Sequence, residues 1–182
     1  MKIPFDRVLV DWLALHGESP ELLPLLEEGE DSAVLKIADE LRVRIVDMAI
    51  KATLETPSVF LDEIVDYHTA SLMDSSGVVL RMPDDYLKLH SLQMEDWKEK
   101  VTATEPEDTL RYALGANAPA WMICAERPMV KAERDSEGIA LRVYGTRSTS
   151  PPLRLTYVPR PAFDGETLRV SAAAYHRLLQ QE

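Results

Sequence analysis

The chain has 182 residues, of which 46% are hydrophobic and 28% are charged. Its formal net charge of −11 argues against independent nucleic-acid binding, which needs a basic patch that outweighs the rest of the surface. No apolar run approaches the roughly 20 residues of a membrane span. The single cysteine, Cys124, excludes an internal disulfide or a cysteine-based zinc site. The charged N-terminal stretch lacks a secretory pattern, so we expect an intracellular protein.

The charge is distributed unevenly along the chain. Residues 1–108 hold 24 acidic and 10 basic side chains, a net charge of −14, whereas residues 109–182 hold 7 and 10, a net charge of +3. This asymmetry permits contacts between the acidic half of one copy and the basic half of another. The alternative is a solvated acidic face with no partner.

Helical patterns dominate the first third of the chain. Apolar residues at helical spacing predict a helix over residues 4–16 and a longer one over residues 33–53. Between them, residues 18–31 form either a tight loop packed by leucines or a docking arm. Thr56-Pro57 predicts the start of a third helix that continues to His68.

The chain changes character in the middle. Two runs rich in β-formers, Val78–Met82 and Tyr86–Met94, flank Pro83-Asp84-Asp85, which predicts a strand, a turn and a second strand. We interpret residues 98–118 as a long surface loop with one helical turn at Leu110–Leu114.

Short strands are expected in the last third. They are predicted at Trp121–Glu126, Val130–Arg134, Ile139–Tyr144 and Leu153–Val158. The turn at residues 135–138 predicts a hairpin, because Gly138 can adopt the positive φ that closes it. Alternation in the last two strands predicts that Leu141 and Leu155 are buried and that Arg142 and Arg154 lie on an outward, basic face. Thr167 is expected to cap a final helix.

These patterns together predict an α+β fold. An N-terminal helical part, residues 1–74, precedes an antiparallel β part closed by a C-terminal helix, residues 75–182, and the two form one continuous structural unit.

The sequence offers little evidence for chemistry. The four histidines are scattered, and no glycine-rich phosphate loop or nucleophile motif is present. Asp62, Glu63 and Asp66 cluster on the third predicted helix, and an acidic site using Asp62, Asp66 and His68 is the enzymatic alternative. We predict no catalytic residue, no metal and no cofactor. Trp97 is the best candidate for an interface anchor, with a place in the sheet's own core as the alternative.

The segment Leu80-Arg81-Met82-Pro83-Asp84-Asp85-Tyr86-Leu87-Lys88-Leu89 resembles the head-to-tail connector (adaptor or ring) proteins of tailed bacteriophages. Their pattern is apolar, Pro, Asp, Asp, aromatic, Leu, basic, Leu. The resemblance extends loosely over the last two thirds of the chain, through Asp96-Trp97, Ala118-Pro119-Ala120, Leu141-Arg142-Val143-Tyr144 and Tyr157-Val158-Pro159.

This resemblance implies a non-enzymatic virion protein, made in the host cytoplasm and located at the head-to-tail junction. Copies would form a ring of twelve that joins the portal protein to the tail proteins and surrounds passing double-stranded DNA, without sequence-specific binding and without a membrane. The candidate interface residues are Trp97, Asp84, Asp85, Arg142, Arg154 and Arg160. The alternatives are a cytoplasmic binding module that uses the basic sheet face and an enzyme with the acidic site.

Overall fold

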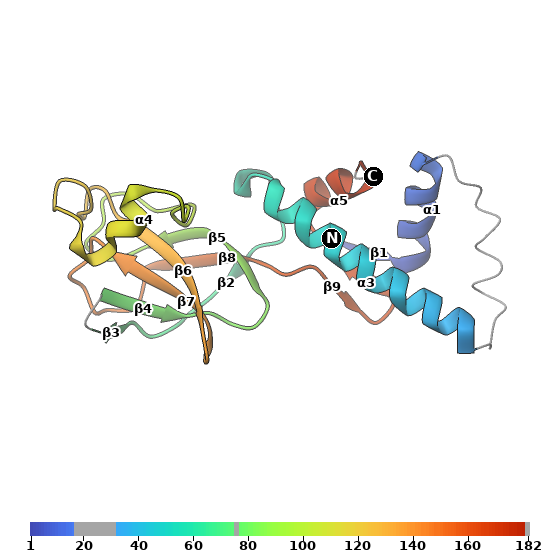
Figure 1. The fold of residues 1–182 in the computed structure, drawn as a ribbon, viewed down its shortest axis with the longest axis horizontal. Helices are drawn as coiled ribbons and strands as arrows, with labels where there is room; N and C mark the ends of the chain where they lie inside the picture. Colours follow the sequence, from blue (N-terminus) through green and yellow to red (C-terminus); the bar gives the residue numbers. More distant parts are fainter. Residues whose placement is uncertain (17–31, 75–76, 181–182) are drawn as a thin grey trace. The chain divides into compact units, whose positions relative to one another are not determined.

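The computed structural model describes residues 1–16, 32–74 and 77–180 (Figure 1). The chain divides into two compact units, of which the first comprises Met1–Glu63 and Arg160–Glu182 and the second Ile64–Pro159. The fold is α+β with antiparallel sheets and a C-terminal helix, as predicted. The expected boundary at residue 74 needs correction. The C-terminal helix packs against the N-terminal helices, and two short strands before residue 75 belong to the second unit.

The first unit consists of helices and one small sheet. Strands β1, β10 and β9 pair antiparallel in that order, and β1 leads directly into α1. The elements are β1 (Lys2–Pro4), α1 (Phe5–His16), α3 (Ser32–Glu55), η2 (Ser58–Phe60), β9 (Ala162–Asp164), β10 (Thr167–Arg169) and α5 (Ala172–Leu179). The predicted helices over residues 4–16 and 33–53 are therefore confirmed. The loop or arm expected at residues 18–31 lies outside the described residues.

The core of the first unit lies between its helices. Helical spacing places one apolar stripe of α3 against α1 and α5, since residues three and four apart share a helix face. Its fully or nearly fully buried side chains include Val8, Leu9, Ile45, Ala49, Ala52, Ala174 and Leu178.

The third predicted helix is wrong. After Thr56-Pro57 the chain makes only the short 3-10 turn η2 and then continues in extended conformation. Val65 pairs with Tyr157, and the Tyr67 amide donates to the carbonyl oxygen of Leu155. Pairing with a distant strand thus prevails over the helical spacing of the apolar residues in this segment.

The final helix begins later than predicted. Thr167 does not cap it but lies in β10, which forms a hairpin with β9 around Gly165, whose φ is 61°. The N-cap of α5 is Ser171, with extended backbone angles that deliver the chain into Ala172.

The second unit contains two antiparallel sheets that share one core. One sheet has the order β2, β8, β5, and the other has the order β3, β4, β7, β6. Buried side chains of both, among them Leu80, Leu89, Leu141 and Leu155, form a single hydrophobic cluster. The elements are β2 (Val65–Asp66), β3 (Leu72–Asp74), β4 (Gly77–Arg81), β5 (Tyr86–Gln93), α4 (Leu110–Leu114), η3 (Gly115–Asn117), β6 (Met129–Asp135), β7 (Gly138–Tyr144) and β8 (Arg154–Pro159).

Most predicted strands of this unit are confirmed. β4 and β5 flank the turn at Pro83, which carries the chain from one sheet to the other. The hairpin of β6 and β7 closes at Asp135 and Gly138, and Gly138 has φ 116°. The strand predicted over residues 121–126 is wrong. The segment consists of hydrogen-bonded turns, with an isolated β-bridge between Cys124 and Arg127.

The alternation predicted for the last two strands holds only in part. Leu141 and Leu155 are buried, and Arg154 is exposed, as expected. However, β7 and β8 belong to different sheets, so Arg142 and Arg154 do not share one basic face. Thr156 is also buried, at 1% exposure, which shows that both sides of β8 are covered.

Candidate interaction surfaces

Trp97 is part of the core of the second unit. Its side chain is 4% exposed, and its indole Nε1 donates to the carbonyl oxygen of Gly145 over 3.1 Å. Trp97 therefore cannot serve as the exposed interface anchor considered from the sequence. The alternative, a place in the sheet's own core, describes it correctly.

The two aspartates of the predicted turn have different surroundings. Both are exposed, but Asp85 accepts a hydrogen bond of 2.6 Å from the hydroxyl of Tyr157 in β8. Asp85 therefore ties the turn to the neighbouring strand, whereas Asp84 lies at the surface.

The three candidate arginines have different surroundings. Arg142 forms an ion pair of 2.9 Å with Glu133 on the adjacent strand β6, and its side chain is 19% exposed. Arg154 begins β8 in the second unit, and Arg160 belongs to the first unit; both are exposed. The structure thus leaves Arg154 and Arg160 available to a partner and places Arg142 in a contact within its own sheet.

The residues of the enzymatic alternative are divided between the two units. The Asp62 carboxylate accepts a hydrogen bond of 3.1 Å from the Ala172 amide at the start of α5. Hydrogen bonding by the Ser171 side chain, with a further contribution from the Ala172 amide, lowers the pKa of Asp62 below its usual value. Asp66 and His68 belong to the second unit. Among residues 1–16, 32–74 and 77–180, no cluster of three His, Cys, Asp or Glu side chains fits a metal ion.

Basic groups lie near His90 of β5, in the β2, β8, β5 sheet. Tyr157 and Leu155 point into the shared core, so Arg154 and Thr156 point to the opposite side. The His90 ring on β5 is hydrogen bonded to Thr156 through Nδ1, with 2.9 Å between the heavy atoms. Burial, followed by the positive charges of Arg154 and Lys100, lowers the pKa of His90. Two basic side chains, Arg154 and Lys100, therefore act electrostatically on His90.

The structure also exposes large apolar side chains that the sequence patterns did not predict to be exposed. In the first unit Phe60 is 65% exposed and Val43 62%. In the second unit Trp121 is 68% exposed and Leu153 66%. A signal for Phe60 and Trp121 was present in the sequence, since Pro57 and Pro119 precede them and favour turns over regular elements.

Trp121 stands beside a surface groove of about 560 Å³. The groove also has Lys100, Arg111 and Arg127 along its walls. Arg111 is committed within the chain, because it pairs with Glu105 at 3.3 Å and donates to the Pro128 carbonyl oxygen at 3.1 Å.

A second groove, of about 400 Å³, lies between α3 and β9 in the first unit. Its floor is apolar, and carboxylates stand along α3 at its rim. Its lining residues are Asp39, Arg42, Val43, Val46, Asp47, Ala162 and Phe163. The Arg42 guanidinium pairs with Glu166 at 3.1 Å and lies 4.9 Å from the centroid of the Phe5 ring, which it covers.

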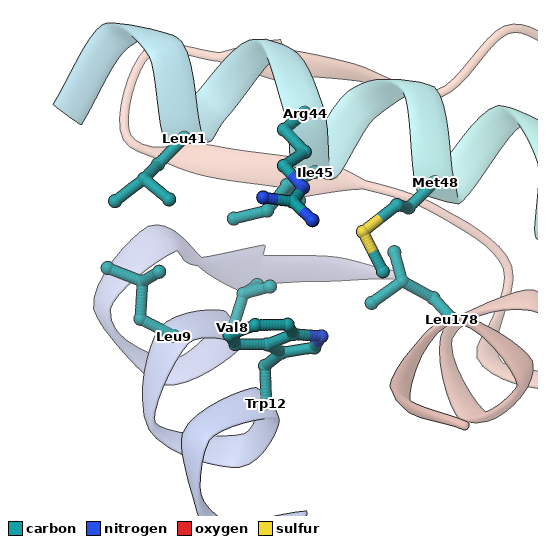
Figure 2. Close-up of a pocket in the computed structure, with 8 residues that line it drawn as sticks. All are labelled: Val8, Leu9, Trp12, Leu41, Arg44, Ile45, Met48 and Leu178. Atoms are coloured by element: carbon teal, nitrogen blue, oxygen red, sulfur yellow. The ribbon is translucent and has the colours of Figure 1, made fainter. Parts of the chain in front are cut away.

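A third hollow lies among α1, α3 and α5 (Figure 2). Figure 2 shows the Arg44 side chain extending from α3 toward the indole of Trp12, with Met48 and Leu178 beside it. Its volume of about 30 Å³ corresponds to about one water molecule. This hollow is a packing defect between helices, too small for a substrate.

The structure is that of an α+β protein. Its distinctive surface features are exposed large apolar side chains and exposed arginines. No helix among the described residues is long and apolar enough to cross a bilayer. A comparison with protein-family models found no match, and comparisons with curated proteins and with solved structures found none either.

Proposed function

We propose that this chain is a structural subunit of an oligomeric head-to-tail connector ring of a tailed bacteriophage. The ring joins the portal to the tail and surrounds the channel through which DNA passes. The subunit is made in the host cytoplasm and resides at the head-to-tail junction of the virion. Its contacts are with further copies of itself and with portal and tail proteins, and it performs no catalysis.

The residues that resemble the connector family support this proposal through their place in the fold. Leu80, Tyr86 and Leu89 of the resembling segment are buried in the core shared by the two sheets. The turn at Pro83 between them presents Asp84 at the surface. The resemblance therefore rests on residues that determine how the chain passes from one sheet to the other.

The observation that carries the proposal is that both compact units expose large apolar side chains. Phe60 in the first unit and Trp121 in the second are each about two-thirds exposed. A closed ring requires heterologous contacts, in which one surface of a subunit meets a different surface of the next. Exposed aromatic side chains are typical anchors of such contacts. A ring subunit needs apolar anchors for its neighbours, and each unit of this chain exposes one.

The charge of the two units supports a passive role toward DNA. The first unit holds 17 acidic and 9 basic side chains, a net charge of −8, and the second 14 and 11, a net charge of −3. Both units are therefore acidic, in contrast to the acidic and basic halves expected along the sequence. An acidic channel wall repels phosphate and keeps the duplex from sticking.

Electron microscopy of the purified chain tests the proposal. We expect ring-shaped particles with a central opening. Only single-chain particles, or compact aggregates without rotational symmetry, would contradict it.

The basic groups around His90 favour a second candidate, a binding module for an acidic protein. Arg154 of β8 and Lys100 both act electrostatically on His90 of β5, and such a cluster of basic groups could hold an acidic partner. Titration of the chain with an acidic polypeptide such as polyglutamate tests this candidate. Saturable binding by a monodisperse monomer that Arg154→Glu abolishes would favour it over the ring.

A further inference from the structure

The groove between α3 and β9 combines an apolar floor with carboxylates on one helix face. Asp39, Val43 and Asp47 follow one another at intervals of four residues and therefore lie on the same side of α3. Val43 is 62% exposed, so the apolar floor is open to solvent. The volume of about 400 Å³ falls within the range of roughly 300–1,000 Å³ of pockets that hold ligands.

The charges of the groove are only partly balanced within the chain. Arg42, the one cation among the groove's lining residues in the described part of the chain, pairs with Glu166 at 3.1 Å and with Asp39 at 3.7 Å. Asp47 has no ion pair with another described residue and is exposed. The groove thus presents a carboxylate beside exposed apolar surface.

The second unit presents the complementary combination. Leu153 is 66% exposed and directly precedes Arg154, the exposed first residue of β8. The Leu153 amide donates to the Gln93 carbonyl oxygen at 3.0 Å, which anchors this pair to the end of β5. Arg154 forms no ion pair with another described residue. A large apolar side chain and a free guanidinium therefore project from a fixed backbone.

Building on the ring proposed above, we infer that Leu153 and Arg154 of one copy dock into the α3–β9 groove of a second copy. Leu153 lies on the apolar floor beside Val43, and Arg154 pairs with Asp47. This occupant fits because its guanidinium is opposite in charge to the Asp47 carboxylate and its leucine matches the apolar surface of the groove. A polyanion such as DNA is disfavoured, because Asp39 and Asp47 would repel it. The contact is heterologous, since a surface of the second unit meets a surface of the first, as ring closure requires.

Charge reversal tests this contact. Arg154→Glu and Asp47→Arg should each weaken association of the purified full chain about tenfold or more, measured by analytical ultracentrifugation over a concentration series. The double variant should associate again, because the pair is restored with its signs exchanged. An equimolar mixture of the two single variants should also assemble. Wherever one variant contacts the other, the groups at positions 154 and 47 have opposite charges.

Two matched controls accompany these variants. Glu40→Arg reverses a neighbouring exposed carboxylate of α3 that does not line the groove, and Arg134→Glu reverses an exposed arginine of β6. Both should leave association unchanged, and the far-ultraviolet circular dichroism spectrum should be the same for every variant, which shows that each one is folded.

Each outcome decides the inference. Single variants that assemble like the parent chain, or a double variant that stays dissociated, overturn it while the ring itself stands. Rescue in the double variant without rescue in the mixture shows a contact within one chain and also overturns it. A parent chain that is monomeric at all concentrations overturns the proposed function and this inference together.

Discussion

The indole Nε1 of Trp97 donates a hydrogen bond to the carbonyl oxygen of Gly145 at 3.1 Å, and the indole ring is 4% exposed. Trp97→Phe keeps most of the apolar surface but leaves that carbonyl without its donor. We expect a loss of about 1–3 kcal/mol in the free energy of unfolding, measured by urea denaturation. Trp121→Phe, at a side chain that is 68% exposed, should change it by less than about 0.5 kcal/mol. Equal effects at the two positions would contradict the assignment of Trp97 to the core.

Leu141 is completely buried between the two sheets of the second unit. Leu141→Ala should reduce the free energy of unfolding by about 2–5 kcal/mol, because it removes buried methyl groups and leaves a cavity. Leu110→Ala, at a leucine that is 64% exposed, is the matched control and should cost less than about 0.5 kcal/mol. A loss at Leu141 as small as that of the control would mean that the strand register is wrong.

The Asp62 carboxylate accepts from the Ala172 amide at the N-terminus of α5, and its pKa is lowered in the folded chain. A carboxyl group with a lowered folded-state pKa stabilises the fold above its unfolded pKa of about 3.9, and this stability is lost as the pH falls through the folded-state pKa. At pH 7, Asp62→Ala should cost about 0.5–2 kcal/mol, as loss of a capping oxygen does.

The pH dependence separates this role from simple packing. The difference in stability between the parent chain and Asp62→Ala should shrink as the pH falls below about 4. Asp66→Ala, at an exposed carboxylate of β2, is the matched control and should change the free energy of unfolding by less than about 0.5 kcal/mol at pH 7. A penalty for Asp62→Ala that stays constant down to pH 2 would contradict a role for the ionised carboxylate.

Sequence patterns predicted local elements well and distant pairings poorly. The apolar stripe of α3 and the turn before Gly138 are local signals, and both structures form where they were expected. The segment after Pro57 has helical spacing too, but Val65 pairs with Tyr157, a residue more than 90 positions away. The local sequence pattern of that segment contains no information about its pairing with Tyr157. The same limit explains why α5 was not assigned to the unit of the N-terminal helices.

The candidate surface residues were predicted with mixed success for a related reason. Arg154 is exposed as expected, whereas Arg142 pairs with Glu133 on the neighbouring strand, a partner set by the register of β6 and β7. Trp97 was a candidate anchor, but it is buried, and its indole donates to the carbonyl oxygen of Gly145 in a distant part of the sequence. Exposure of large side chains is decided by such long-range packing.

The purified chain should not bind duplex DNA at physiological salt. Both units have a net negative charge, so the usual gain from counterion release requires a local basic face that outweighs them. Fluorescence anisotropy with a labelled duplex, from about 50 to 200 mM salt, measures this directly. Arg142→Glu and Arg154→Glu serve as controls for the arginines. Tight binding that weakens steeply with salt, and that these changes abolish, would contradict the passive role and favour the binding module.

The mass of the assembled particle, measured by native mass spectrometry on the purified chain, tests the proposed function most directly. The connector proposal predicts one discrete species, a ring of twelve copies of the 20.5 kDa chain, stable on dilution. The interfaces that hold it should each bury more than about 1,000 Å². A single-chain mass at every concentration tested would contradict the proposal.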